Sequence, residues 1–201
     1  MSNSVDSEHI FFKYAIPELK KKGFEYLGVL GSGSYGIVGL FKKRSKEFAI
    51  KAVNNYSIYT KAKHEAVTKG KTLSSAVNFR KLAHGISMNN ILRESRRKRI
   101  CKNIDNLYMS DTFISDRHLG SSKIPLYTYF KGEHFDSDLS KFLRKSIRHA
   151  ELNTNDLKKI FYQVALGIRC LHRIGILHYD IKELNILINK ETLNLKIIDY
   201  D

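Results

Sequence analysis

Three closely spaced glycines, Gly31, Gly33 and Gly36, constrain the fold of this chain more than any other feature of its sequence. The flanking segments, residues 24–30 and 35–43, are rich in aromatic, apolar and β-branched side chains and read as strands. Glycine allows a backbone to approach phosphate oxygens closely, although a plain strand turn explains the glycines taken alone. A dinucleotide-binding fold needs a helix directly after such glycines, and a strand follows here. The run therefore predicts the tip of a β-hairpin that lies as a lid over a nucleotide.

The rest of the chain shows strand signals first and a long helical pattern later, which predicts an α+β fold in two parts. The polar and basic stretch 54–110 is expected to hold one or two helices. Further elements are expected from the apolar patterns as follows: strands over residues 47–53, 124–130, 176–177, 185–188 and 195–198, a helix around 139–147, and a longer helix over 155–174.

The longer helix carries one apolar stripe on a period of 3.6 residues. The stripe consists of Leu157, Ile160, Phe161, Val164, Ile168 and Leu171. Thr154 is the expected N-cap and Gly175 lies just beyond the C-terminal end, where glycine suits a helix stop. Because the chain ends at Asp201, the stripe is expected to stay partly exposed.

Composition excludes several classes of protein. Hydrophobic residues make up 42% of the 201 residues, which is enough to bury a core and rules out wholesale disorder. No apolar run reaches the roughly 18 residues of a membrane span, and the polar N-terminus shows no secretory signal. Cys101 and Cys170 form no CxxC pair, so neither a zinc site nor a disulfide is expected, and a reducing compartment fits.

The chain is strongly basic, with a net charge of +15. Such a charge favours anionic partners, and the densest basic run, residues 93–102, could serve nuclear import or nucleic-acid binding. Acidic residues are interspersed along the chain, so a solvated helix face explains the run better. A nucleic-acid partner is not expected.

Chemistry-bearing residues follow the glycine run at three places. Ala49 and Lys51 share one face of the third expected strand, where a small residue leaves room for a base and a lysine reaches phosphate oxygens. The segment His178-Tyr-Asp-Ile-Lys-Glu-Leu-Asn185 places a base, a cation and a metal-binding amide on one loop. Asp199 adds a carboxylate at a strand end, where Mg²⁺ could be held.

The sequence resembles the eukaryotic-type protein kinases in four segments: the glycine run, Ala49-Ile-Lys51, the loop His178–Asn185 and Asp199-Tyr-Asp201. Lys182, two residues after Asp180, is typical of the serine/threonine class. The resemblance covers residues about 24–201 and implies a bilobal fold with a β-rich N-lobe and an incomplete, mainly helical C-lobe. It divides the chain into an N-terminal extension (1–23), an N-lobe (24–130, with an insertion at about 54–90) and a partial C-lobe (131–201).

The resemblance also implies a role for each matched residue, with ATP and Mg²⁺ as cofactors. The glycine loop would cover ATP with Leu30, Gly31, Ser32, Gly33, Ser34, Tyr35 and Gly36. Val38 and Ala49 would enclose adenine, and Lys51 would contact the α- and β-phosphates. Asp180 would orient the substrate hydroxyl and Lys182 would neutralise the γ-phosphate. Asn185 and Asp199 would hold Mg²⁺.

The glutamate that pairs with Lys51 in this family has two candidates here. Glu94 lies at family-like distances from the following strand if an insertion precedes it, and it is preferred over Glu65. The basic run would then form the exposed face of the helix that carries Glu94.

Three features depart from the family pattern. Tyr179 replaces the arginine before Asp180, so regulation through a phosphate bound by that arginine is not expected. Asp201 replaces a glycine, and the chain stops there, before any activation segment. The chain is therefore expected to be part of a longer kinase or a truncated relative that needs a partner.

The expected function is that of a serine/threonine protein kinase, or its N-terminal portion, that transfers the ATP γ-phosphate to hydroxyls of protein substrates. The alternative is a truncated kinase-like module that binds other kinases without catalysis. An intracellular location, cytoplasmic or nuclear, is expected, with no membrane partner. The Lys-, Ile- and Asn-rich composition is typical of an AT-rich genome, such as that of a protist or of a large DNA virus acting in its host cell.

Overall fold

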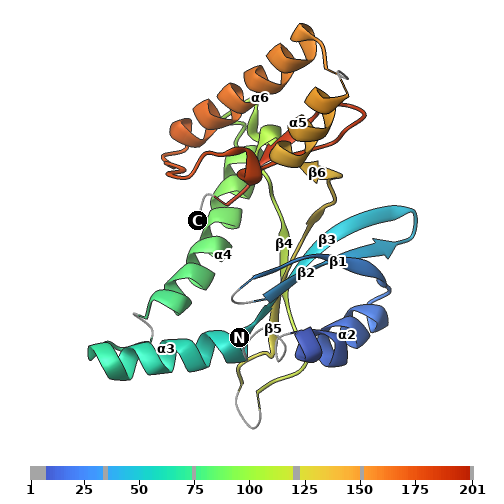
Figure 1. The fold of residues 1–201 in the computed structure, drawn as a ribbon. Coiled ribbons are helices and arrows are strands. Elements are labelled where there is room, and N and C mark those ends of the chain that lie inside the picture. The colour runs from blue at the N-terminus through green and yellow to red at the C-terminus, as the bar shows by residue number, and fades with distance from the viewer. Residues whose placement is uncertain (1–7, 34–35, 74–75, 120–122, 150–151, 200–201) are drawn as a thin grey trace. The chain divides into compact units, whose positions relative to one another are not determined.

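The structure is a computed structural model that describes residues 8–33, 36–73, 76–119, 123–149 and 152–199. Within these ranges the chain mixes antiparallel sheets with helices, as Figure 1 shows, so the expected α+β class is confirmed. No helix of the described part is long and apolar enough to cross a membrane.

The chain folds into two compact units. The first comprises Met1–Ile86 and Ser110–His134, and the second comprises Ser87–Met109 and Phe135–Asp201. The boundary therefore falls inside one helix, α4 (Val77–Arg97). Each unit has its own hydrophobic core.

The first unit contains a five-stranded antiparallel sheet in the order β1-β2-β3-β5-β4. Its strands are β1 (Glu25–Gly33), β2 (Gly36–Lys43), β3 (Lys46–Asn54), β4 (Asp111–Ile114) and β5 (Tyr127–Glu133). The first three expected strands are confirmed, whereas the expected strand at 124–130 begins later, at Tyr127. The four-residue edge strand β4 was not predicted because it carries no alternation of buried and exposed side chains.

The N-terminal residues cover one face of this sheet. A π-helical turn, η1 (Phe11–Ala15), runs directly into α2 (Ile16–Lys21). Buried side chains of these two elements pack against strand residues whose side chains alternate onto the same face. The resulting core consists of Phe11, Ala15, Leu19, Phe24, Ile37, Phe41, Ile50, Ala52, Tyr127 and Tyr129.

A buried carboxylate fixes α2 to the sheet. Glu18 is only 6% exposed, and it accepts hydrogen bonds from Ser115 Oγ (2.5 Å), the Asp116 backbone N–H (2.9 Å) and the Tyr129 hydroxyl (3.1 Å). Burial, reinforced by the charge of Glu18, raises the pKa of Tyr129, so its hydroxyl keeps the proton that it donates. Three donors therefore offset the cost of burying this charge.

Two helices occupy the polar stretch after β3, as expected. The first, α3 (Asn55–Lys69), begins where the Asn54 side chain accepts hydrogen bonds from two backbone N–H groups, and it ends at Gly70, whose φ is +60°. The second is α4, whose C-terminal part contributes Met88 and Leu92 to the core of the second unit.

The second unit packs helices against a small antiparallel sheet in the order β6-β7-β8. Its elements are η3 (Ile104–Asn106), β6 (Ser137–Asp138), α5 (Leu139–Arg148), α6 (Thr154–Arg173), η4 (Glu183–Asn185), β7 (Ile186–Ile188) and β8 (Leu195–Ile197). The helices and the last two strands confirm the sequence pattern. The expected strand at 176–177 is wrong, because these residues form an unpaired connection after α6.

One expectation about α6 is wrong and another is confirmed. The N-cap is Asn153 rather than Thr154, and it forms a capping box with Asp156. The apolar stripe stays partly exposed, as expected: Ile160 and Leu171 are fully buried within the second unit, whereas Phe161 is 61% exposed. The helix approaches β8 closely at Gly167, where a Cβ atom would lie 2.7 Å from the Ile197 side chain.

Cys101 and Cys170 form a disulfide, which contradicts the expectation from their spacing. The two residues are 69 positions apart, but folding brings their Cα atoms to 5.7 Å within the core of the second unit. Sequence spacing detects only local cysteine motifs, so this pairing was not visible in it.

Candidate functional site

The glycine hairpin belongs to the first unit and connects β1 to β2, with Gly33 paired to Gly36. Gly31 and Gly36 differ in what surrounds them. A Cβ atom on Gly36 would lie 2.1 Å from the Ala52 carbonyl oxygen, so packing of the sheet requires glycine there. A Cβ atom on Gly31 would meet no atom within 4 Å, so the space beside Gly31 is open to a ligand. The candidate residues Ser34 and Tyr35 lie outside the described residues.

The proposed adenine and phosphate residues share the sheet face opposite α2. Val38 pairs with Lys51 across β2 and β3, and Leu40 pairs with Ala49, so Val38, Ala49 and Lys51 project to the same side. Lys51 is exposed, whereas its neighbours Ile50 and Ala52 are buried on the α2 side. The sheet therefore assigns these three residues to one face, and the shared face of Ala49 and Lys51 is the one that the sequence predicted.

The remaining glycine-loop candidates also lie on exposed positions of β1. The Leu30 side chain is 46% exposed, and Ser32 is exposed next to Gly33. Leu30 and Ser32 thus face solvent near the end of β1.

The two candidate partners of Lys51 have other ionic contacts. Glu94, on α4, accepts from Arg97 Nη2 at 2.7 Å and lies 3.1 Å from Lys98 Nζ. These two cations lower the pKa of the Glu94 carboxyl. Glu65, on α3, pairs with Lys69 at 3.2 Å. The pairing of Lys51 with Glu94 stays a prediction.

The loop before β7 gathers the proposed catalytic residues of the second unit. Lys182 Nζ donates to Asp180 Oδ2 at 2.6 Å, and Asn185 Nδ2 donates to the same oxygen at 3.0 Å. Asn185 Nδ2 also contacts the Asp180 carbonyl oxygen at 2.9 Å. The Asp180 side chain remains 58% exposed, so a carboxylate held by a cation and an amide is accessible to a bound hydroxyl.

Hydrogen bonds to Lys182 and Asn185 set the charge state of Asp180. The contact with Lys182 is the largest cause that lowers the pKa of its carboxyl below the ordinary value of 3.8. Asp180 is therefore ionised at neutral pH and can accept a proton or orient a hydroxyl group.

His178 positions this loop, a role that the sequence reasoning did not assign. The ring is 7% exposed, and its Nδ1 atom accepts from the Asp180 backbone N–H at 3.3 Å. The Nε2 atom of the ring lies 2.8 Å from the Ile198 carbonyl oxygen, which can only accept, so Nε2 donates in this hydrogen bond. His178 thus ties the residue before Asp199 to the backbone of Asp180. In the sequence, the position of His178 at the start of the loop motif was the one signal for this role.

Asp199 follows β8 in a left-handed backbone conformation, with φ at +56°. The Ile198 backbone N–H donates to the Asn185 carbonyl oxygen at 2.9 Å, so the chain places Asp199 beside the loop that carries Asn185. Amide and carboxylate oxygens are the ligands that Mg²⁺ prefers, so the donor set fits this ion. Among the described residues, no group of three or more His, Cys, Asp and Glu side chains lies where it could hold a metal ion.

Tyr179 occupies the position where the family pattern has arginine. Its side chain is 91% exposed and its backbone is left-handed, with φ at +58°. A tyrosine cannot bind a phosphate through an ion pair, so the absence of regulation by that route stays a prediction from the sequence. Asp201, the other substituted position, lies outside the described residues.

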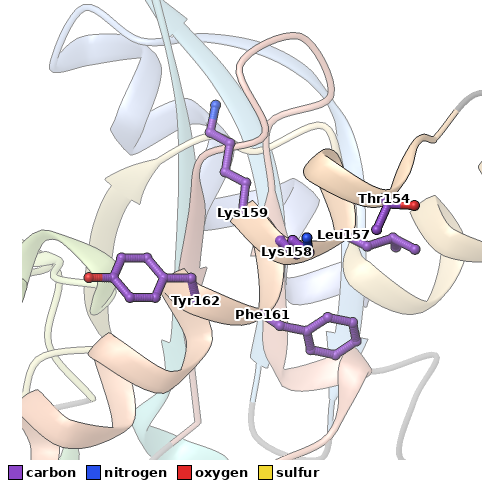
Figure 2. A pocket seen from close by; sticks show the side chains of 6 residues that line it. All are labelled: Thr154, Leu157, Lys158, Lys159, Phe161 and Tyr162. Carbon is purple, nitrogen blue, oxygen red and sulfur yellow. The ribbon is translucent and has the colours of Figure 1, made fainter.

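A hollow of about 660 Å³ lies on the outer face of α6 (Figure 2) and contains none of the motif residues. Figure 2 shows the rings of Phe161 and Tyr162 pointing to different sides of the helix, and the two side chains are 61% and 66% exposed. Leu157 and Phe161 of the expected stripe line this hollow, so part of the stripe lies on the surface of α6.

A family model described as the protein kinase domain matches residues 24–201. The chain therefore belongs to the protein kinase family, which the sequence motifs had indicated.

Individual relatives are serine/threonine and cyclin-dependent kinases. The chain is 28% identical over 183 residues to the probable serine/threonine-protein kinase fhkB of Dictyostelium discoideum, which covers 89% of this chain and 13% of that protein. It is 42% identical over 79 residues to cyclin-dependent kinase B2-2 of Arabidopsis thaliana, which covers 38% of this chain and 24% of the relative. The probable CTD kinase subunit alpha homolog of Encephalitozoon cuniculi is 36% identical over 72 residues. The chain thus spans a quarter or less of the length of each of the first two relatives.

Proposed function

We propose that this chain carries the nucleotide-binding and catalytic residues of a serine/threonine protein kinase, which transfers the γ-phosphate of ATP to hydroxyl groups of proteins. The observation that carries the proposal is the exposed Asp180 carboxylate, held by Lys182 at 2.6 Å and by Asn185 at 3.0 Å. An ionised and fixed carboxylate can orient a serine or threonine hydroxyl for attack.

Residues of the first unit would bind the nucleotide. Val38 and Ala49 offer a small apolar surface for the base, Lys51 offers a cation for phosphate oxygens, and the open space beside Gly31 admits the phosphates. In the second unit, Asn185 and Asp199 would hold the Mg²⁺ ion that neutralises the phosphate charge. Lys182 lies beside Asp180 and would stabilise the charge that develops on the transferred phosphoryl group.

Nucleotide binding can be tested without any assumption about the substrate. Mg·ATP should raise the melting temperature of the chain, because a ligand that binds only the folded state stabilises it. Lys51→Met should abolish most of this shift, whereas Lys63→Met, at an exposed position of α3, should leave it intact. A folded chain with no shift at millimolar Mg·ATP would contradict the nucleotide site.

Phosphoryl transfer requires a second measurement, because binding and catalysis use different residues. We expect Asp180→Asn to keep the thermal shift while it lowers incorporation of radiolabelled phosphate into casein or histone by roughly 100-fold or more. Asp199→Ala should reduce both the Mg²⁺-dependent part of the shift and the incorporation. Equal transfer by the parent chain and the Asp180 variant would show that the role given to Asp180 is wrong.

The alternative function, a kinase-like module that binds other kinases, makes a different prediction in the same assays. Such a module would give an Mg·ATP shift or none, but no transfer that depends on Asp180. The module is therefore favoured if Lys51→Met reduces the melting-temperature shift with Mg·ATP while Asp180→Asn leaves phosphate incorporation unchanged.

A further inference from the structure

Two basic segments far apart in the sequence meet at one end of the first unit. Lys43 Nζ, at the end of β2, donates to the carbonyl oxygen of Lys22, just after α2, at 2.7 Å. The same ammonium group lies 4.7 Å from the centre of the Phe24 ring. These contacts place the segment that directly follows α2 beside the last residue of β2, just before the turn to β3.

Acidic neighbours neutralise only part of this surface. Lys22 pairs with Asp116 at 2.6 Å, and Lys42 lies between Glu25 and Glu47 in the strand register. The remaining exposed cations have no acidic partner within the described part of the chain. We call them the basic cluster: Lys20, Lys21, Lys43, Arg44 and Lys46.

The turn at the centre of the cluster breaks two rules of hairpin stability. Arg44 has a φ of +57°, a left-handed conformation that favours glycine, asparagine or aspartate and strains other residues. Lys43 and Lys46 are register partners directly across the hairpin, where like charges repel. A turn selected for stability alone would avoid both choices, and such local conflicts are typical of functional sites.

We propose that the basic cluster is a binding surface for an acidic segment of a partner protein. Bound carboxylates would relieve the repulsion between Lys43 and Lys46 and would accept hydrogen bonds from the Arg44 guanidinium. The surface lies on the hairpin end opposite the glycine loop, because Lys43 and Gly36 are the two ends of β2. Binding there would not require catalysis, so the proposal is independent of the proposed function.

Other anionic partners fit the surface less well. Single-stranded nucleic acid binds where exposed aromatic rings stack on bases, but the ring covered by Lys43, Phe24, is only 7% exposed. A membrane surface is bound by basic residues together with an exposed apolar face, and this turn offers none. A short acidic peptide needs only the clustered cations.

The test compares two variants that each remove two positive charges. Arg44→Gly/Lys46→Gln changes the cluster, and Lys145→Gln/Arg148→Gln changes exposed residues of α5 in the second unit. The probe is a fluorescein-labelled peptide of twelve glutamates, with binding followed by fluorescence anisotropy at low salt. We expect the cluster variant to bind about fivefold or more weakly and the α5 variant to bind within about twofold of the parent chain.

A second readout separates binding from folding. The cluster variant should melt at the same or a higher temperature than the parent, because glycine fits the left-handed position and the repulsion across the hairpin is gone. Weaker binding together with unchanged or higher stability supports the proposal. Equal losses in both variants, or no loss in the cluster variant, would overturn it. A larger loss for a twelve-nucleotide thymidine strand or for phosphatidylserine vesicles than for the peptide would overturn the assignment to an acidic protein segment.

Discussion

The side-chain amide of Asn185 donates both to the carboxylate of Asp180, at 3.0 Å, and to the backbone carbonyl of Asp180, at 2.9 Å. A single buried side chain therefore fixes the position of the proposed catalytic carboxylate and the path of its backbone. Asn185 is only 6% exposed, so water cannot readily replace these contacts.

Asn185→Ala should reduce stability as well as function. It removes both contacts to Asp180 and leaves the Asp180 carbonyl oxygen without this donor. We expect the free energy of unfolding to fall by about 1–3 kcal/mol, measured by urea denaturation. Asn155→Ala, at an exposed position of α6, is a matched control that should change stability far less. Equal stabilities of the two variants would show that Asn185 does not organise the loop.

Two glycines of the hairpin should respond differently to alanine. Gly36→Ala places a Cβ atom 2.1 Å from the Ala52 carbonyl oxygen, so it must disturb the pairing of β2 with β3. Its melting temperature should drop by several degrees with or without nucleotide. Gly31→Ala meets no atom within 4 Å, so it should fold normally and lose only part of the Mg·ATP shift. The opposite result, with normal folding of Gly36→Ala and a large loss of stability in Gly31→Ala, would show that Gly31 is not the glycine that faces the ligand.

Lys182→Met should raise the pKa of the Asp180 carboxyl towards its ordinary value, because the hydrogen bond to Lys182 is the main cause of its lowering. The pKa of this carboxyl is lower in the folded chain than in the unfolded chain, so its ionised form stabilises the fold at pH values above the ordinary pKa of 3.8. This stabilisation is lost as the pH falls through the lowered pKa. The substitution should therefore reduce the pH dependence of the free energy of unfolding. A titration of the Asp180 carboxyl carbon by NMR measures the shift directly, and an unchanged pKa would contradict the ion pair.

Glu18→Ala should destabilise the first unit. It removes the acceptor of three hydrogen bonds, from Ser115, Asp116 and Tyr129, inside a buried contact between α2 and the sheet. Unsatisfied buried donors cost about 1–3 kcal/mol each, so a loss of at least this size is expected in thermal or urea unfolding. Glu8→Ala, at an exposed position, should have little effect. If both variants unfold alike, α2 is not fixed by Glu18.

Local patterns in the sequence were sufficient to predict the elements that carry the motifs. The glycine run between two segments rich in aromatic, apolar and β-branched residues predicted the β1–β2 hairpin, and the 3.6-residue period predicted α6 to within one residue at each end. Both signals depend on neighbours within a few positions along the chain, and such patterns are readable without tertiary structure. The loop that holds Asp180, Lys182 and Asn185 was likewise found by its spacing, because its hydrogen bonds join residues at most five positions apart.

Long-range contacts decided the remaining features of this protein. Three of them join residues that are 21 to 111 positions apart. They are the hydrogen bonds of Glu18 with Ser115 and Tyr129, the disulfide between Cys101 and Cys170, and the contact of Lys43 with Lys22. Hydrophobic burial selects which surfaces come together, and it acts on the folded chain as a whole rather than on any short segment. The sequence alone therefore determined the kinase motifs and the elements that carry them, whereas the tertiary structure alone decided how the N-terminal helix is fixed to the sheet and where the basic cluster forms.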